Sequence, residues 1–269
     1  MIYYKTHEEI ELMRESNQLV SKTLSYVAGL LKVGKSGIEI DKKAEEHIRD
    51  HGGVPAFKGY RGFPATLCMS LNDAVVHGIP SGTAFAPTDI VSIDCGVVMN
   101  GFYGDAAFTF AFSQTGDEVK QLLRTTRLAL QEGINVAIPG NRIGDISHAI
   151  QHFCEKVHGY GIVRELVGHG VGRNLHEDPE VPNFGMKGKG PVLKEGMVIA
   201  IEPMVNMGHK AVKQLSDGWT ILSRDGMPSA HFEHSVAITK NGPDILSDHS
   251  CIDDAIKKNE ELVEISINF

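Results

Sequence analysis

The chain has 269 residues, of which 42% are hydrophobic and 22% are charged, and its formal net charge is -8. These values are typical of a folded protein with one substantial core or two fused halves, and they exclude a disordered or collagen-like chain. The acidic balance also argues against nucleic acid as the main partner, because it repels a phosphate backbone.

Cysteine usage and the N-terminal residues indicate where the protein works. No run of about 18 apolar residues is present to cross a bilayer, and the start MIYYKTHEEIELMRE lacks the basic and apolar regions of a signal peptide. Four cysteines stand far apart without a C-x-x-C pair, as reduced cytosolic thiols do. We therefore expect a cytoplasmic protein with no membrane partner.

Two helices are expected at the N-terminus. The capping box Thr6-x-x-Glu9 precedes apolar residues at helical spacing, which predicts a long amphipathic helix to about Leu31. After a break at Gly34, a second and shorter helix is expected over residues 36–50.

The same order of elements returns in the second half of the chain. Apolar periodicity predicts a helix over residues 119–134, and Asn141 can cap another that reaches Val157. Segments of β type follow each helix pair, over residues 74–79, 89–98, 103–112, 196–203, 219–223 and 231–240.

This repeated pattern predicts one α+β domain built of two similar halves, about residues 1–115 and 116–247. Antiparallel strands would lie on one side and helices on the other. The polar tail after Asp248 is expected to be peripheral.

A predicted hairpin over residues 90–110 carries two carboxylates. Its Asn100-Gly101 dipeptide favours a two-residue type I′ turn, and the resulting register places the side chains of Asp94 and Asp105 on the same face. Solvated aspartates are the alternative, but the many apolar neighbours make these strands interior. Two like charges inside a protein need a cation, so we expect a divalent metal pair here.

Three further acidic or imidazole groups lie in apolar or glycine-rich segments. His169 stands between glycines in GHGVGRNLHEDP, which suits either a metal ligand or a structural histidine. Glu202 closes the strand GMVIAIEP and Glu233 lies in SAHFEHSVAI, where an unpaired charge would be strongly unfavourable. His77 in AVVHGIP, taken alone, is consistent with an ordinary hydrogen-bonded histidine.

Together these residues form an oxygen-rich set of two Asp, two Glu and one His. Such a ligand set suits Mn, Fe(II) or Co, and it differs from a structural zinc site, which is rich in thiolates. Two ions about 3.5 to 4 Å apart can activate a water for attack on a carbonyl, so the residues indicate metal-assisted hydrolysis.

The ordered series of these five residues, with GYRGFPATLCMSLNDAVVHGIP, NGFYGD, GHGVGRNLHEDP and IEP, resembles bacterial-type type I methionine aminopeptidases over nearly the whole chain. The resemblance implies the pita-bread fold and removal of the initiator methionine from nascent proteins whose second residue is small. It also implies two divalent ions (Co, Mn, Fe(II), Zn or Ni), transient contact with the ribosome, a monomer and no DNA partner.

The resemblance assigns a role to each metal-site residue. Asp94 would be the bidentate ligand of one metal, Asp105 and Glu233 would bridge both, and His169 and Glu202 would complete the other.

It also assigns the substrate contacts. His77 would lie near the scissile nitrogen, His176 would polarise the substrate carbonyl, and Glu202 would double as the proton shuttle. The methionine pocket would be lined by Tyr60, Phe63, Cys68 and Trp219, with Leu175 and Met204 close by.

Several positions depart from the usual family pattern. Tyr103 stands where histidine is frequent, Ala106-Ala107 where hydroxyl residues are frequent, and His231 where glutamine is common. These positions flank ligands, so we expect them to tune the rate without changing the reaction class.

Two other functions share this pattern. A proline-directed peptidase would carry the same five ligands but usually has an additional N-terminal domain, for which little room exists before Asp94. A pita-bread binding module or chaperone would have lost its ligands, whereas this chain keeps all five.

Overall fold

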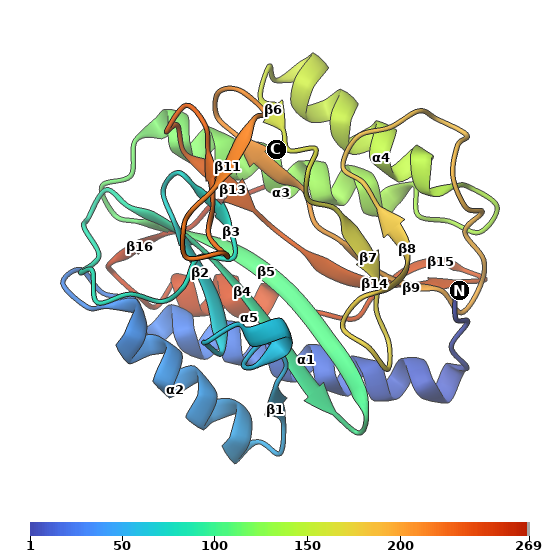
Figure 1. Cartoon of the computed structure of the whole chain (residues 1–269), viewed down its shortest axis with the longest axis horizontal. Coiled ribbons are helices and arrows are strands. Elements are labelled where there is room, and N and C mark those ends of the chain that lie inside the picture. The colour runs from blue at the N-terminus through green and yellow to red at the C-terminus, as the bar shows by residue number, and fades with distance from the viewer. Residues whose placement is uncertain (268–269) are drawn as a thin grey trace.

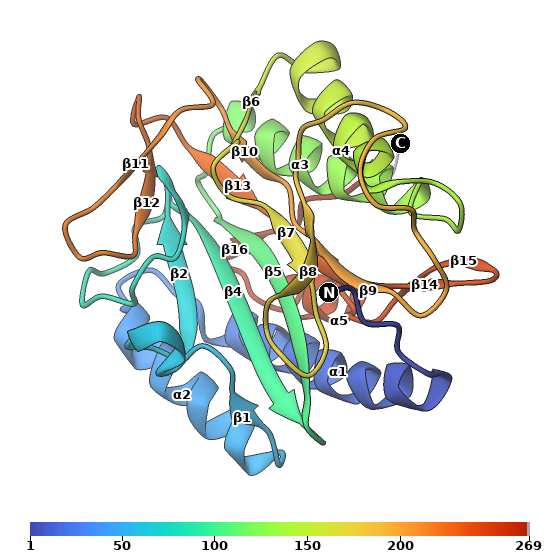
Figure 2. The ribbon, with the colours of Figure 1, turned by 45° about the vertical axis from the view of Figure 1, so that its right-hand side comes forward.

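The computed structural model describes residues 1–267. Within that range, no helix is both long enough and apolar enough to span a bilayer. Helices α1 (His7–Leu30) and α2 (Gly37–Asp50) lie along one edge of the molecule, and α3 (Asp117–Asn135) and α4 (Ile143–Gln151) lie along the opposite edge, with curved sheets between them (Figures 1 and 2). The α+β class is the one predicted, although the helix pairs lie at two opposite edges and not together on one side of the strands.

Local capping predicts the start of α1 and comes within one residue of the start of α4. Thr6 Oγ1 accepts the Glu9 N–H at 3.2 Å and the Glu9 carboxylate accepts the Thr6 N–H at 3.1 Å, which starts α1. Helix α4 starts one residue later than expected because Asp145 accepts the N–H of Arg142, while Asn141 donates to a carbonyl of the preceding turn. A π-helix, η2 (His152–Val157), continues it to the predicted end.

Every strand pair within the sheets is antiparallel. One five-stranded sheet contains β1 (Val54–Pro55), β2 (Leu67–Leu71), β4 (Ile90–Met99), β5 (Phe102–Phe112) and β16 (Leu262–Val263). The other contains β7 (Gly168–Gly170), β8 (Glu177–Val181), β9 (Val198–Ile201), β14 (His234–Thr239) and β15 (Gly242–Ile245).

Two three-stranded sheets complete the described structure. They contain β3 (Ala74–Val76), β11 (Val212–Gln214) and β12 (Ile221–Ser223), and β6 (Gly161–Ile162), β10 (Met204–Asn206) and β13 (Ser229–His231). The segment predicted as one strand over residues 231–240 is divided between β13 and β14 at Phe232-Glu233. Several strands lie outside the predicted segments, β2 and β8 among them, because they are short and show no clear alternation of apolar and polar residues.

The hairpin of β4 and β5 has the register expected from its turn. Asn100 and Gly101 have φ values of 54° and 77°, both left-handed as a type I′ turn requires. Asp94 is paired with Ala107 and Gly96 with Asp105, so the two aspartates are diagonal neighbours on one face. This prediction is confirmed.

The C-terminal tail is the main correction to the sequence-based expectation. It is not peripheral: α5 (Ser250–Ile256) packs on α1, β16 pairs with β5, and Ile252 and Ile256 belong to the main apolar cluster. Arg127 of α3 forms an ion pair with Asp253 at 2.5 Å. The tail packs on the core through a few regularly spaced apolar residues. Its many charged residues led to the expectation that it is peripheral. The division of the chain into two duplicated halves stays a prediction.

Candidate functional site

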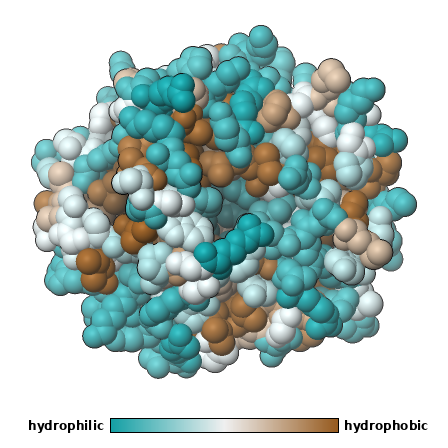
Figure 3. Space-filling view, viewed as in Figure 1, coloured by the Kyte–Doolittle hydropathy of each residue, from teal (hydrophilic) through white to brown (hydrophobic). Residues whose placement is uncertain are grey.

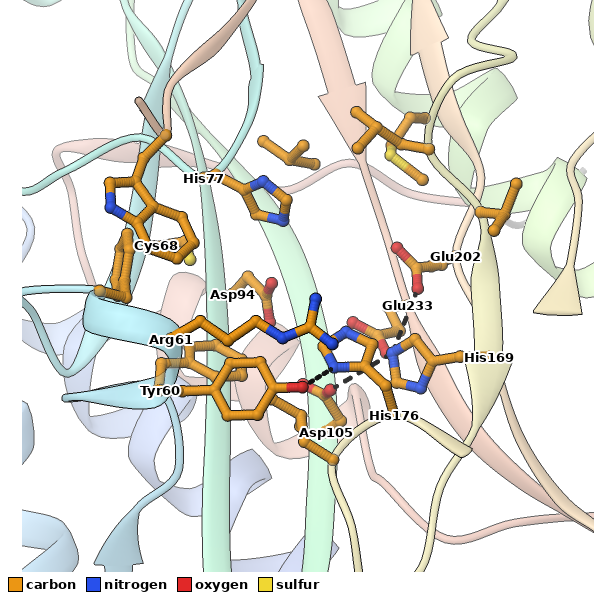
Figure 4. A pocket seen from close by; sticks show the side chains of 18 of the residues that line it. Tyr60, Arg61, Cys68, His77, Asp94, Asp105, His169, His176, Glu202 and Glu233 are labelled. Carbon is orange, nitrogen blue, oxygen red and sulfur yellow. Dashed lines mark hydrogen bonds and ion pairs between the residues drawn. The ribbon is translucent and has the colours of Figure 1, made fainter. Parts of the chain in front are cut away.

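A cavity of about 300 Å³ is lined by residues from both halves of the chain. The face shown in Figure 3 is hollowed near its centre, and Figure 4 shows the side chains that point into the cavity. All the predicted metal-site and substrate-contact residues line it: His77, Asp94, Asp105, His169, His176, Glu202, Glu233, Tyr60, Phe63, Cys68, Trp219, Leu175 and Met204. The structure therefore brings the predicted set together, while the role of each residue stays a prediction.

The two aspartates are positioned by the hairpin and by its neighbours. On β4, Asp94 lies opposite Cys68 of β2 in the same sheet. On β5, the N–H of Asp105 donates to Asn17 of α1 at 3.2 Å, and its carbonyl accepts the Ser235 hydroxyl at 2.9 Å. Helix α1 and strand β14 thus hold the backbone behind the second carboxylate.

The other three groups come from the second half of the chain. The Nδ1–H of His169 donates to the Gly170 carbonyl at 2.9 Å, so in the neutral imidazole the lone pair is on Nε2. That Nε2 lies 3.6 Å from Glu202 Oε1 and 3.9 Å from Asp105 Oδ2. Glu233, between β13 and β14, is tied to the first sheet by its N–H, which donates to a carbonyl of β5. One imidazole nitrogen therefore points into a group of carboxylates.

Burial changes the protonation of these carboxylates. It is the main reason that the pKa of Asp94 and the pKa of Glu202 rise to about 7. For Asp94, neighbouring His231 opposes this rise and Glu202 adds to it. For Asp105 and Glu233, burial first and neighbouring carboxylates second raise the pKa well above its ordinary value. Four acids in one cavity cannot all ionise near neutral pH without a cation.

The donor atoms fit a bound divalent metal. Asp94 Oδ1, Asp105 Oδ1 and Glu233 Oε1 are buried and accept no hydrogen bond from any described residue, which is uncommon for buried oxygens. Asp105, His169 and Glu233 present donor atoms within 4.8 Å of one another. Carboxylate oxygens with one imidazole nitrogen are ligands of borderline divalent ions.

The other two predicted histidines are neutral. Burial is the main cause that lowers the pKa of His176 to about 3, and the neighbouring His169, Arg61 and His77 lower it further toward that value. Its Nδ1 lies 2.8 Å from the Tyr60 hydroxyl. At neutral pH this imidazole therefore forms hydrogen bonds and carries no charge.

His77 follows β3 at the opposite side of the cavity. Its φ of 57° is left-handed, which is rare for a residue other than glycine and is common at functional sites. Burial and the neighbouring His231 lower its pKa to about 4. The ring meets Trp219 edge-on, with 6.4 Å between ring centroids.

An apolar wall adjoins the carboxylates. Phe63 and Trp219 meet edge-to-face at 5.1 Å, and they belong to one cluster with Tyr60, Cys68 and Leu175. An unbranched apolar side chain placed against this wall would have its backbone beside the carboxylates.

Sequence reasoning missed several residues of the cavity. Arg61, Phe57, Glu165, Leu166 and Val167 also line it. A charged residue inside the aromatic segment GYRGFP was the available signal for Arg61. His231, predicted only as a flanking departure, has its Nε2 3.6 Å from Glu202 Oε2.

Comparison with known proteins identifies the family. The pattern of metallopeptidase family M24 matches residues 11–240. A methionine aminopeptidase from Clostridium perfringens is 50% identical over 247 residues, which cover 92% of this chain and 99% of that protein. The crystal structure of a methionine aminopeptidase from Thermotoga maritima has a TM-score of 0.90 at 44% identity, covering 92% of this chain and 100% of its own.

A prolidase from Pyrococcus horikoshii is similar with a TM-score of 0.75, over 91% of this chain and 63% of its own, but at 23% identity it shares the fold alone. The pita-bread fold expected from the sequence is confirmed by these structural similarities. The chain belongs to metallopeptidase family M24 and, within it, to the methionine aminopeptidases.

Proposed function

We propose that this protein is a metal-dependent aminopeptidase that removes the N-terminal methionine from polypeptides whose second residue is small. The observation that carries the proposal is the convergence of two buried carboxylates, Asp105 and Glu233, two partly buried ones, Asp94 and Glu202, and Nε2 of His169 beside an apolar wall. The names of its relatives, at up to 50% identity among those above, support the same activity.

Five residues would hold two divalent ions: Asp94, Asp105, His169, Glu202 and Glu233. The unpartnered buried oxygens support this assignment, and Co, Mn, Fe(II), Zn and Ni all suit the donor set. When bound, such ions supply Lewis-acid activation of water and of the scissile carbonyl.

The side chains of the chain itself orient the substrate and move the proton. If the Tyr60 hydroxyl donates to Nδ1 of His176, the neutral imidazole carries its proton on Nε2 and can donate to the developing oxyanion. Glu202, with a pKa near 7, can accept a proton from the attacking water and return it to the leaving amine. His77 would bind near the scissile nitrogen.

The sizes of the first and second substrate side chains would determine the specificity. The wall of Tyr60, Phe63, Cys68 and Trp219 would take the methionine side chain. The second residue must then pass the crowded polar side of the cavity, where a bulky side chain would be rejected more strongly than a small one. We also propose that the substrates are nascent chains met at the ribosome, and that the enzyme is a cytoplasmic monomer.

Chelation followed by re-addition of single metals tests the proposal. Met-Ala-Ser hydrolysis should be lost on chelation and restored by one or more ions, with about two ions bound per chain. Met-Leu-Ser and an Ala-Pro peptide should be cut far more slowly. Equal rates on Met-Leu-Ser would indicate a general aminopeptidase, faster Ala-Pro cleavage would indicate a proline-directed peptidase, and absence of bound metal would indicate a binding module.

A further inference from the structure

Arg61 is an exposed residue that brings a positive charge to the lining of the cavity, and no predicted role accounts for it. It lies on the short helix η1 (Tyr60–Gly62) and lines the same cavity as the carboxylates. Figure 4 shows its side chain extending across the cavity toward His176. The guanidinium is therefore close to the groups proposed to bind the scissile carbonyl.

The backbone turn sets the direction of this side chain. Arg61 has φ of 49° and ψ of 23°, a left-handed conformation that is unfavourable for a residue other than glycine. Hydrogen bonds from Gly59 N–H to the Phe63 carbonyl at 2.8 Å and from Phe63 N–H to the Tyr60 carbonyl at 2.9 Å close the turn around it. Such strain persists where the surrounding structure enforces it, which is common at binding sites.

The Arg61 charge has no partner within residues 1–267. No hydrogen bond or ion pair joins its guanidinium to another described residue, and its one aromatic contact is the neighbouring Tyr60 ring, 5.4 Å from its Cζ to the centroid. By contrast, Arg14, Arg49 and Arg164 each form an ion pair with a carboxylate. A guanidinium is thus available to bind an anion that enters the cavity.

The proposed binding mode indicates which part of a substrate would meet it. In an extended peptide, side chains one and three point to the same side. The methionine side chain would point to the wall that includes Tyr60, and Arg61 is the next residue on the same short helix. The third substrate side chain would therefore point toward the η1 side of the cavity.

We propose that Arg61 is a specificity-determining residue that binds an acidic side chain at the third position of the substrate. This inference rests on the proposed aminopeptidase function and adds a substrate preference to it. The carboxylate would accept hydrogen bonds from the guanidinium. Exposed Glu165 also lines the cavity. If the third substrate residue lay beside Glu165 instead, the enzyme would prefer a basic side chain there, which is the opposite expectation.

A peptide series Met-Ala-X-Ser with amidated C-termini tests the proposal, since amidation removes the terminal carboxylate. We expect kcat/KM to fall in the order Asp, Ser, Lys at X, with about a three- to tenfold difference between Asp and Lys at low salt. The preference should shrink as ionic strength rises. Arg61→Ala should bring the three rates to within about twofold, and Arg61→Glu should reverse the order.

Lys58→Ala is the matched control. Lys58 is a nearby cation outside the cavity that pairs with Glu45 at 2.6 Å, so its loss should leave the preference unchanged. Equal rates for Asp and Lys in the unmodified enzyme, a preference for Lys, or an acidic preference that survives Arg61→Ala would each overturn the proposal. The parent peptide Met-Ala-Ser would still be cut in those cases, whereas failure to cut any methionyl peptide would overturn the proposed function itself.

Discussion

His176 binds Tyr60 through its Nδ1 at 2.8 Å, which leaves Nε2 as the atom available to a substrate. It is neutral at working pH because burial lowers its pKa to about 3. In this position an imidazole can stabilise an oxyanion without holding a metal.

We therefore expect His176→Ala to lower kcat by about 10²- to 10³-fold, the usual loss for a single oxyanion donor. Metal content, measured by elemental analysis of the purified variant, should be unchanged. Tyr60→Phe serves as the comparison and should lower kcat less, since it removes only the hydroxyl that orients the ring. Loss of both metals in His176→Ala would show that this residue is a ligand.

The raised pKa values of the carboxylates predict a pH dependence of metal binding. Asp94 and Glu202 have a pKa of about 7 in the folded protein, against about 4 in an unfolded chain. These groups stabilise the metal-free fold below about pH 4, and this contribution is lost as pH rises through about 7. A metal must displace their protons, so its stabilising effect should grow as pH rises.

The measurement is the increase in melting temperature on adding a fixed concentration of metal, at pH 5.5, 6.5 and 7.5. We expect the increase to be largest at pH 7.5. Buried neutral histidines such as His234 also make stability depend on pH, but they do so equally with and without metal. Their effect therefore cancels in the increase in melting temperature. An increase in melting temperature that is independent of pH would contradict the raised carboxylate pKa values.

Among the structural elements, residues 1–6 form an N-terminal arm that holds the loop between β7 and β8 in place. Lys5 Nζ and Glu177 Oε2 are 2.7 Å apart, and their side chains are only 5% and 4% exposed. Glu177 follows His176 directly and also accepts the Asn174 N–H at 3.1 Å. Arg173 of the same loop forms an ion pair with Glu9 at 3.0 Å. The arm and α1 thus hold the loop that carries His176.

Lys5→Met should destabilise the protein by about 3 to 5 kcal/mol, because it leaves the Glu177 carboxylate buried without its cation. Adding Glu177→Met should recover much of that loss. The free energy of unfolding in urea checks both expectations, and Arg173→Ala, which breaks a more exposed pair, should cost about 1 kcal/mol or less. A cost below about 1 kcal/mol for Lys5→Met would show that water still reaches the Lys5–Glu177 ion pair.

At the scale of the whole molecule, the C-terminal tail completes the core. Ile252 of α5 is fully buried in the main apolar cluster, and Arg127 lies with its Cζ 5.2 Å from the ring centroid of Phe108 while it binds Asp253. Since Phe108 is on β5 with Asp105, the tail packs behind the strand that supplies part of the site.

Ile252→Ala should therefore cost about 2 to 5 kcal/mol of unfolding free energy, the range for truncating a buried isoleucine. Ile38→Ala, at a side chain of α2 that is 55% exposed, is the matched control and should change it by about 0.5 kcal/mol or less. Midpoints of urea unfolding compare the two variants. Equal small costs would show that the tail is not part of the cooperative core.

The features that could be predicted from the sequence are local or are carried by specific motifs. The turn Asn100-Gly101 predicts the register of β4 and β5 because only one pairing follows from a two-residue turn, and that register places Asp94 and Asp105 together. Capping likewise predicts the start of α1. The apolar or glycine-rich neighbours of His169, Glu202 and Glu233 make them candidate ligands, but no local rule joins them to Asp94. The substrate-contact residues follow only from the resemblance to a family.

How the distant segments meet could not be predicted from the sequence and is seen only in the folded chain. The direction of His169 Nε2, the burial of the Lys5 and Glu177 pair and the packing of α5 each join residues more than 50 positions apart. Hydrophobic periodicity and turn chemistry describe neighbours along the chain, whereas these contacts depend on how sheets and helices pack. The position of Arg61 in the cavity is of the same kind, because it follows from a strained turn that no propensity favours.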